Sequence, residues 1–203
     1  MARGEFESQR ALATYIPDNI APAIAYGPLK SNPKHAFFLS EFRTMRMQII
    51  SPQTLAKILE KLHTSSSSPT GKFGFPVKTY KGHTPINNKW CDTWEEWFSR
   101  QFRSEITWEQ NIRGEDPEFQ ALANELLEKV VPRLLRPLET GGRSIKPVLC
   151  HGDLWHGNIE VDLDTQNAIM FDSCCVYGHN ECTSTSHCVC CYSLFPRSRC
   201  GRS

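Results

Sequence analysis

Apolar residues recur every three or four positions in several stretches of the chain, and this spacing predicts amphipathic helices. The first helix is expected over residues 5–16, where it ends because Pro17 follows, and another over residues 52–63. Between them, residues 21–26 and 36–42 have the pattern of extended segments. The connection between these two segments contains the Gly, Pro and Asn residues of a hairpin turn, so we expect them to form a hairpin.

Two further helices are predicted in the middle of the chain, and their apolar residues are expected to be ordinary core. The first has an aromatic face, which consists of Trp94, Trp97, Phe98 and Phe102. Pro132 should kink the second helix, because proline removes one backbone donor. The apolar stripe of this second helix has spacings of three and four and consists of Phe119, Leu122, Leu126, Val130, Leu134 and Leu138.

Residues 71–92 interrupt this periodicity. The stretch is rich in Gly, Pro and Asn, contains interleaved aromatic residues and follows neither a helical nor a strand period. A segment of this length without periodicity inside a compact domain is usually functional or disordered. Its aromatic residues favour a functional role.

A different pattern begins after the double glycine of the sequence. Residues 147–150 form a short apolar segment that predicts a strand, and the polar sequence HGDLWHGN follows at 151–158. Residues 159–161 and 168–171 predict two more strands, separated by the turn-forming sequence DLDTQN. Asp172 directly follows the second of these strands. This part of the chain is therefore expected to form a strand, a loop and a small hairpin.

Composition and charge exclude several classes of function. Lys and Arg number 23 against 22 Asp and Glu, which gives a formal net charge of +1 and no support for a nucleic-acid-binding protein. No apolar run approaches the roughly 20 residues of a membrane-spanning helix. The first ten residues lack the apolar core of a secretory signal, so we expect a cytoplasmic protein with no membrane partner.

The nine cysteines are unevenly distributed along the chain. Only Cys91 and Cys150 lie in residues 1–173, and the other seven follow them near the C-terminus. This placement does not fit a secreted disulfide scaffold, in which cysteines are spread through the fold. Zinc binding is the less favoured alternative to a tail without a selected function. Its ligands would come from Cys182, His187, Cys188, Cys190 and Cys191.

Three polar residues form the pattern that indicates chemistry. Asp153 and Asn158 lie five positions apart on the loop after a strand, and Asp172 follows the small hairpin. Phosphoryl transfer from ATP uses such a set, in which one carboxylate accepts the proton of the substrate hydroxyl while an amide oxygen and a second carboxylate bind Mg²⁺. The spacing of Asp153 and Asn158 also equals that of the Asp and Asn in the catalytic loop of protein kinases.

The alternative is a structural role, with Asp153 as a turn residue and Asn158 as a cap. The complete pattern, which includes the apolar strand before Asp172, argues against this alternative. His151 is expected to support the loop backbone rather than to transfer protons. Trp155 and the following His156 are compatible both with core packing and with substrate contact.

These residues resemble the fructosamine-3-kinase or ketosamine-3-kinase family, which includes the protein-ribulosamine 3-kinases. The combination of HGDLWHGN at 151–158 with FDSCCVYGHNE at 171–181 carries the resemblance. An HGD sequence with a downstream Asp is shared with aminoglycoside- and choline-kinase-like enzymes, whereas the GDLWxGN and YGHxE combination is much narrower. Shorter segments that agree are GEFES at 4–8, FFLSEF at 37–42, GKFGF at 71–75 and NNKW at 87–90.

The resemblance implies an α+β, protein-kinase-like fold of two lobes. It also implies an enzyme that moves the γ-phosphate of ATP to the 3-hydroxyl of a ketosamine. The implied cofactors are ATP and Mg²⁺, and the implied partners are glycated proteins or free ketosamines. The phosphorylated adduct then decomposes, which removes the sugar from the protein lysine.

The same resemblance assigns the catalytic roles residue by residue. Asp153 is the implied catalytic base, and Asn158 and Asp172 are the implied Mg²⁺ ligands. Glu5 matches the helix Glu that pairs with an ATP-anchoring Lys, and Glu7 is the fallback for that role.

Further residues are implied to contact the nucleotide and the sugar. Residues 40–43 would lie at the hinge where backbone groups meet adenine, and Glu41 and Phe42 are the implied cofactor contacts there. The implied substrate contacts are Asn88, Trp90 and Trp155.

The expected organisation is a partial N-terminal lobe over residues 1–46, a mostly helical C-terminal lobe over residues 47–181 and an aberrant, disordered Cys-rich tail over residues 182–203. The family pattern breaks after Glu181, and the chain begins at the helix that carries Glu5, so truncation at both ends is expected. The family's preceding strands would carry the phosphate-covering loop and the ATP-anchoring Lys. No later Lys is expected in a strand position from which it could replace this ATP-anchoring Lys.

Three functions are compatible with these observations. A ketosamine kinase is favoured, and the alternatives are a catalytically inactive remnant that binds partners and a kinase of the same fold that acts on choline, an aminoglycoside or a similar alcohol. Retention of Asp153, Asn158 and Asp172 favours catalysis, whereas the missing Lys favours an inactive chain. The YGHNE and NNKW segments favour a ketosamine over the other alcohols.

Overall fold

Helix α1 (Ala2–Tyr15) is the first element of the computed structural model, which describes residues 1–183. Leu12 and Ile16, four positions apart, are completely buried, as their spacing predicts. The helix begins three residues before the predicted start and ends before Pro17, because a proline ring does not fit the interior of a helix. A 3-10 turn (Pro17–Asn19) follows.

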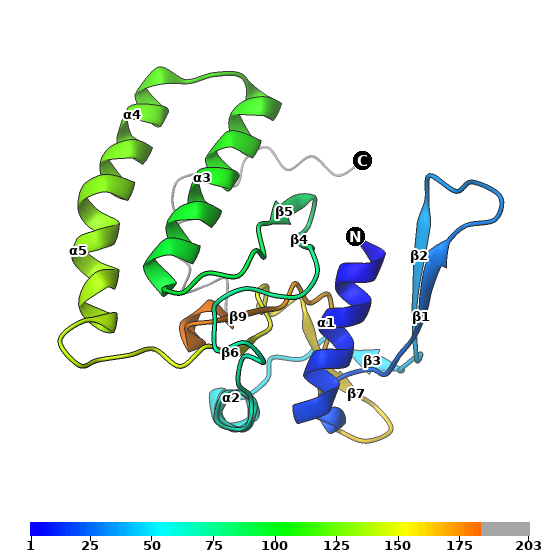
Figure 1. The fold of residues 1–203 in the computed structure, drawn as a ribbon. Helices are drawn as coiled ribbons and strands as arrows, with labels where there is room; N and C mark the ends of the chain where they lie inside the picture. The colour runs from blue at the N-terminus through cyan, green and yellow to red at the C-terminus, as the bar shows by residue number, and fades with distance from the viewer. Residues whose placement is uncertain (184–203) are drawn as a thin grey trace.

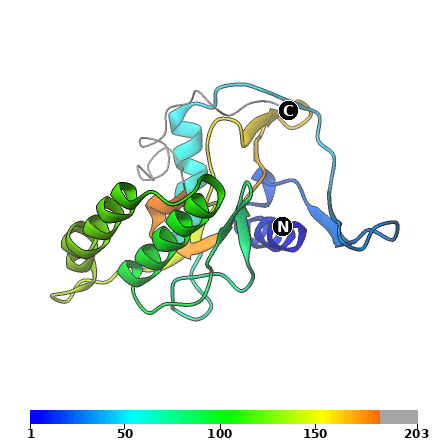
Figure 2. The same cartoon turned by 90° about the horizontal axis from the view of Figure 1, so that it is seen from above.

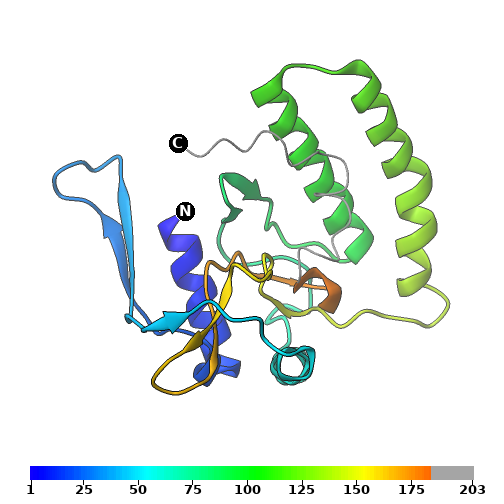
Figure 3. The same ribbon diagram turned by 180° about the vertical axis from the view of Figure 1, so that it is seen from behind.

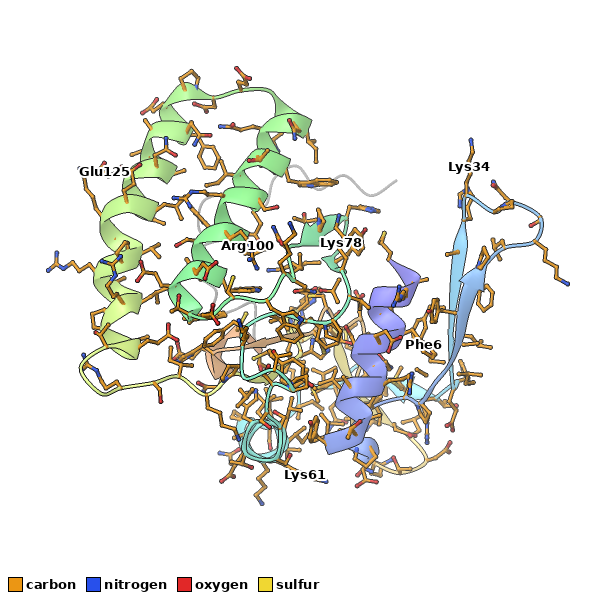
Figure 4. The ribbon with its side chains drawn as sticks, viewed as in Figure 1. Phe6, Lys34, Lys61, Lys78, Arg100 and Glu125 are labelled. Atoms are coloured by element: carbon orange, nitrogen blue, oxygen red, sulfur yellow. The ribbon has the colours of Figure 1, made fainter. Side chains whose placement is uncertain are left out.

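Strands β1 (Ala23–Pro28) and β2 (Ala36–Ser40) form the predicted hairpin, in which Tyr26 lies opposite Phe38. Figure 1 shows the hairpin beside α1, extending away from the rest of the molecule. The ring of Phe6, from α1, packs against Tyr26 and Phe38 at centroid distances of 4.8 and 6.4 Å. Figure 4 shows Phe6 between the helix and the hairpin, so these aromatic contacts hold the two elements together.

Helix α2 (Pro52–Ser65) confirms the predicted second helix and extends it by two residues. Ser51 caps its N-terminus by accepting a hydrogen bond from the Thr54 N–H at 3.1 Å. Its buried residues Ile58 and Leu62 pack into the same cluster as Leu12 of α1. The helix therefore supports the central strands, and Figure 1 shows it end-on below them.

Residues 71–92 contain a short hairpin that the sequence pattern does not reveal. Strand β4 (Thr79–Lys81) pairs antiparallel with β5 (Thr84–Ile86). Gly82 lies in the turn with a φ of +56°, a left-handed conformation that glycine tolerates best. The hairpin lies between α1 and α3 (Trp94–Arg113) in Figure 1.

Helix α3 and the helical segment after it run antiparallel on one side of the molecule, away from the β1–β2 hairpin (Figure 2). This segment consists of α4 (Pro117–Glu125), a π-helical turn (Leu126–Val130) and α5 (Val131–Leu135), and a 3-10 turn (Arg136–Glu139) ends it. The kink predicted at Pro132 stays a prediction, and the helix departs from α-helical hydrogen bonding in the π turn just before this residue. Proline has no N–H to bond to the carbonyl four residues earlier, which permits this local change.

The apolar residues of the two helices differ in their burial. Trp94, Trp97 and Phe102 of α3 are buried, as predicted. For the following segment the prediction of ordinary core is wrong at most positions, because four stripe residues are exposed: Leu122, Val130, Leu134 and Leu138. The buried positions are instead Ala123, Leu127 and Val131. Two packed helices bury only a narrow strip of each surface, so residues beside that strip stay at the surface.

The strands around the candidate site form two small sheets. β6 (Val148–Cys150) pairs with β9 (Val176–Gly178), and β7 (Ile159–Asp162) lies between β3 (Met45–Arg46) and β8 (Ala168–Met170). Figure 3 shows β3 beside the β7–β8 hairpin from behind. The three strands predicted here are confirmed, whereas β3 and β9 were not predicted.

Helices and antiparallel strands together give an α+β fold, as predicted. Leu12 and Ile20 share one buried cluster with Leu149 and Met170, so residues on both sides of the predicted boundary at residue 46 contribute to a common core. The division into two lobes stays a prediction. No helix in residues 1–183 has the length and apolar character needed to cross a membrane.

The packed part of the chain extends two residues past the predicted boundary at Glu181. Thr183 ends a 3-10 turn (Asn180–Thr183) and is 2% exposed. Its carbonyl accepts a hydrogen bond from the Leu154 N–H, and its hydroxyl lies 2.6 Å from His63 Nε2. The rest of the predicted tail, which contains four of the five suggested zinc ligands, lies outside the described residues. Within residues 1–183, no group of three or more His, Cys, Asp and Glu side chains is arranged to hold a metal.

Candidate active site

The loop after β6 owes its path to Gly152. This residue has a φ of +85°, and a Cβ atom at this position would collide with the backbone carbonyl of Cys174. Only glycine avoids both the left-handed strain and the collision. The loop therefore passes directly against the segment that follows Asp172, which brings two distant parts of the chain together.

His151 joins the same two segments by hydrogen bonds. Its side chain is completely buried, and Nε2 lies 3.1 Å from the Phe171 carbonyl oxygen, to which it donates. Nδ1 accepts a hydrogen bond from the Asp153 N–H at 3.4 Å. Burial lowers the pKa of His151 to about 4, so the ring is neutral at pH 7 and its two nitrogens have fixed roles. This geometry agrees with the supporting role expected from the sequence.

Asp153 and Asn158 are in direct contact. Nδ2 of Asn158 donates to the Asp153 carbonyl at 2.8 Å and to its carboxylate oxygen Oδ2 at 3.4 Å. Burial is the main cause that raises the pKa of Asp153 to about 6. The positive charge of Lys81 opposes this shift, whereas the carboxylate of Asp172 adds to it. The five-residue spacing in the sequence thus corresponds to a closed, hydrogen-bonded loop.

Asp172 is brought to this loop by the register of the β7–β8 hairpin. Ile159 lies opposite Met170, so Asn158, which precedes Ile159, meets Phe171, which follows Met170. The Phe171 N–H donates to the Asn158 carbonyl at 3.1 Å. Asp172 itself is exposed and has a φ of +55°. A left-handed conformation is uncommon for a residue with a Cβ atom, and such conformations cluster at functional sites.

Glu5 of α1 lies near the same carboxylate. Burial is the larger cause that raises its pKa, and the negative charge of Asp172 adds to the effect, while the positive N-terminus lowers it. The predicted helix Glu and the predicted metal-binding Asp therefore influence each other electrostatically. Four of the predicted site residues, namely Glu5, Asp153, Asn158 and Asp172, are thus brought together.

The donor atoms at this place fit a hard divalent cation. Both side-chain hydrogen bonds of Asn158 use Nδ2, which leaves its Oδ1 oxygen for a cation. Asp172 is exposed, and it directly follows Phe171, whose N–H donates to the Asn158 carbonyl. Mg²⁺ prefers oxygen ligands and keeps several waters, so one carboxylate and one amide oxygen suffice for its protein contacts.

Lys81 acts electrostatically on the candidate base from a strand that the sequence pattern does not reveal. It lies at the end of β4, and its positive charge opposes the rise in the pKa of Asp153 that burial causes. Strand β4 was not predicted, whereas the expectation that no later Lys replaces the ATP-anchoring Lys stays a prediction. The sequence offers one signal, the alternation of Thr79, Tyr80 and Lys81 before a glycine turn.

Trp155 is 45% exposed on the loop beside Asp153. With His156 it lines a groove of about 530 Å³, whose other side includes Leu55, Leu59 and His63 of α2. The ring of Trp155 contacts that of His156 edge-on at a centroid distance of 4.7 Å. The lining of this groove does not include Asp153, Asn158 or Asp172, so substrate contact by Trp155 stays a prediction.

Asn88 and Trp90 lie farther into the molecule. Asn88 is 6% exposed, and its Nδ2 donates to the Val77 carbonyl at 2.9 Å and to Thr79 Oγ1 at 2.7 Å. Trp90 stacks on Tyr177 at a centroid distance of 6.2 Å. These contacts fix the chain segments that lead into and out of the β4–β5 hairpin.

The predicted hinge residues lie beyond β2. The Glu41 N–H donates to the Pro22 carbonyl at 2.8 Å, so that N–H is already occupied by the β1–β2 pairing. The Glu41 carboxylate pairs with Arg43 at 3.1 Å, and Phe42 is 85% exposed. The structure places neither residue in contact with Asp153.

Comparison with known proteins gives one consistent result. The fructosamine kinase family model matches residues 1–189. The protein-ribulosamine 3-kinase of Oryza sativa subsp. indica is 32% identical over 149 residues, which cover 72% of this chain and 40% of the rice protein. The ketosamine-3-kinase of Mus musculus is 34% identical over 111 residues, which cover 54% of this chain and 33% of the mouse protein.

Solved structures agree at the level of the fold. A protein from Thermobifida fusca assigned as a fructosamine-3-kinase superimposes with a TM-score of 0.64 at 20% identity, over 89% of this chain and 57% of that one. A Haemophilus somnus protein with the same assignment gives a TM-score of 0.62 at 22% identity, over 90% of this chain and 57% of that one. The matched part thus spans less than half of the curated relatives and somewhat more than half of these structures. The match of the family model over nearly the whole chain shows that the protein belongs to the fructosamine kinase family.

Proposed function

We propose that this chain transfers the γ-phosphate of ATP to the 3-hydroxyl of a ketosamine, such as a ribulosamine or fructosamine on a protein lysine. The observation that carries the proposal is the hydrogen-bonded pair of Asp153 and Asn158 with the carboxylate of Asp172 beside it. Membership of the fructosamine kinase family supports the same reaction class. The names of the rice and mouse relatives support ketosamines as the acceptors, whether free or on glycated proteins.

In this proposal Asp153 is the catalytic base. Its carboxylate accepts the proton of the 3-hydroxyl as that oxygen forms a bond to the γ-phosphorus, and the bond from this phosphorus to the leaving ADP breaks. Burial raises the pKa of Asp153 to about 6, which makes it a better proton acceptor than an exposed Asp while it stays mostly ionised at neutral pH. The Asn158 amide holds the carboxylate in place through Nδ2.

Asn158 and Asp172 would hold the metal through Asn158 Oδ1 and the exposed Asp172 carboxylate. Mg²⁺ bound there would neutralise the negative charge of the phosphates. Asn158 would then have two functions, because its nitrogen orients the base and its oxygen would bind the metal. Glu5, Glu41 and Phe42 are the proposed ATP contacts.

The proposed sugar contact on the catalytic loop is Trp155, which is exposed and follows Asp153 by two residues. Asn88 and Trp90 would contribute indirectly, by holding the β4–β5 hairpin in place. Decomposition of the phosphorylated adduct would release the lysine, so the proposed role in the cell is the repair of glycated proteins.

The test is phosphate transfer from MgATP to a panel of acceptors by the purified full chain. Ribulosyl-lysine and fructosyl-lysine represent ketosamines, and choline and an aminoglycoside represent other alcohols. The proposal predicts transfer to the ketosamines alone, with the phosphate on O3, and a loss of about 10³-fold or more in the Asp153→Asn variant. Transfer to choline or the aminoglycoside would instead support another small-molecule kinase. A folded chain that transfers phosphate to no acceptor would support a non-catalytic binding protein.

A further inference from the structure

Lys81 occupies a defined position relative to the catalytic loop. It follows Thr79 by two residues in β4, so the two side chains leave the same face of the strand. Thr79 Oγ1 donates to the Cys175 carbonyl at 3.4 Å, which identifies that face as the one toward the segment after Asp172. Lys81 therefore faces the same segment that packs against Gly152.

The charges of the site agree with this position. The charges of Lys81, Asp153 and Asp172 all affect the pKa of the buried Cys174 thiol. This thiol lies against the catalytic loop, because a Cβ atom at Gly152 would be only 2.9 Å from its sulfur. The positive charge of Lys81 also opposes the rise in the pKa of Asp153 that burial causes. The same place also holds the carboxylate of Glu5, near Asp172. An incoming phosphate group therefore meets several carboxylates, and a nearby cation offsets their repulsion.

The hairpin that carries Lys81 is fixed on both sides. Asn88 Nδ2 donates to Thr79 Oγ1 at 2.7 Å. Gly4 of α1 packs so closely that a Cβ atom there would lie 2.5 Å from the Lys78 carbonyl oxygen. The start of β4, just before Lys81, is thus held between α1 and the core, so the strand that carries this cation has a defined place beside the site, as preorganised electrostatic stabilisation requires.

We propose that Lys81 is a catalytic residue whose ammonium group contacts the phosphoryl group during its transfer to the acceptor. This assignment rests on the proposed function and adds a residue to that site. As the bond from the γ-phosphorus to ADP breaks and the bond to the acceptor oxygen forms, negative charge is spread over the equatorial phosphoryl oxygens. Lys81 stabilises this charge and keeps its own protons, because the proton of the hydroxyl goes to Asp153.

The test compares Lys81→Met with Lys81→Arg and with the matched control Lys78→Met. Lys78, labelled in Figure 4, directly precedes β4 and has an exposed side chain. Its Nζ lies 5.5 Å from the centroid of the Tyr80 ring. Lys81→Met is expected to lower kcat by about 10²-fold with a much smaller change in KM, as loss of a transition-state contact does. Lys81→Arg should recover a large part of that loss, and Lys78→Met should match the unaltered chain.

A binding measurement gives a second readout. Calorimetry with a ketosamine 3-phosphate and with the same ketosamine lacking phosphate should show that Lys81→Met weakens only the phosphorylated compound, by about tenfold. Circular dichroism verifies that each variant is folded. Equal behaviour of Lys81→Met and Lys78→Met in an active chain would overturn the assignment of Lys81 alone. An unaltered chain that neither transfers phosphate nor binds either compound would overturn the proposed function, and this assignment with it.

Discussion

The close packing at Gly152 can be measured by substituting alanine there. Gly142 provides a matched control, because its φ of +80° is close to the +85° of Gly152, but a Cβ atom at Gly142 would have no atom within 4 Å. A Cβ atom at Gly152 would instead meet the Cys174 carbonyl, which is backbone and cannot rotate away. The two variants therefore share the conformational cost and differ in the collision.

The expected magnitudes follow from these two contributions. Placing alanine in the left-handed region costs roughly 1–2 kcal/mol, which is the whole expected loss for Gly142→Ala. Overpacking at a buried position adds about 1–3 kcal/mol, so Gly152→Ala should lower the free energy of unfolding by about 2–5 kcal/mol. Because the loop must shift, Asp153 moves as well, and phosphate transfer should fall far more in this variant than in Gly142→Ala.

Urea unfolding followed by tryptophan fluorescence gives both free energies, and the phosphate-transfer assay gives the rates. The account requires a larger loss of stability for Gly152→Ala than for Gly142→Ala. Equal losses would show that the loop does not pack against Cys174 as described, and the positions derived for Asp153 and Lys81 would lose their support.

Two other predictions concern stability. Burial lowers the pKa of His151 to about 4 from a reference value of 6.5, so the unfolded chain binds the proton first, and stability should fall as the pH drops from about 6.5 toward 4. The variant His151→Asn should be less stable than the unaltered chain at pH 7, but its free energy of unfolding should fall less between pH 7 and pH 5. Urea unfolding at the two pH values measures both quantities. Equal decreases in the two proteins would contradict a buried, neutral His151 ring. In the α3–α5 pair, Leu127→Ala should cost about 2–4 kcal/mol, because Leu127 is 4% exposed, whereas Leu122→Ala, at a position 60% exposed, should cost less than about 1 kcal/mol. Thermal unfolding compares the two variants. A larger loss of stability for Leu122→Ala than for Leu127→Ala would contradict the observed burial of Leu127.

Strong local periodicity made much of the fold predictable. Leu12 and Ile16 mark the buried side of α1, and the turn-forming residues between β7 and β8 predict the hairpin that delivers Asp172 to the loop. The juxtaposition of Asp153, Asn158 and Asp172 follows from that hairpin, because its register decides which residues meet.

Tertiary context decided the features that the sequence did not reveal. β4 and β5 have three residues each, within a stretch rich in Gly, Pro and Asn, and they are stabilised by α1, α3 and the buried Asn88 rather than by their own pattern. Lys81 was missed with them. In the α4–α5 segment the apolar stripe and the buried strip differ, because the position of α3, and not the periodicity, determines which side is covered.

The most direct test of the central claim is the rate at which the full chain transfers phosphate from MgATP to ribulosyl-lysine, compared with that of Asp153→Asn under identical conditions. Both proteins should first be shown to be folded by circular dichroism. If the carboxylate of Asp153 is the base of a phosphoryl-transfer site, the unaltered chain phosphorylates O3 and the variant is slower by about 10³-fold or more. Equal rates in the two folded proteins, or no transfer by the unaltered chain, would contradict the account.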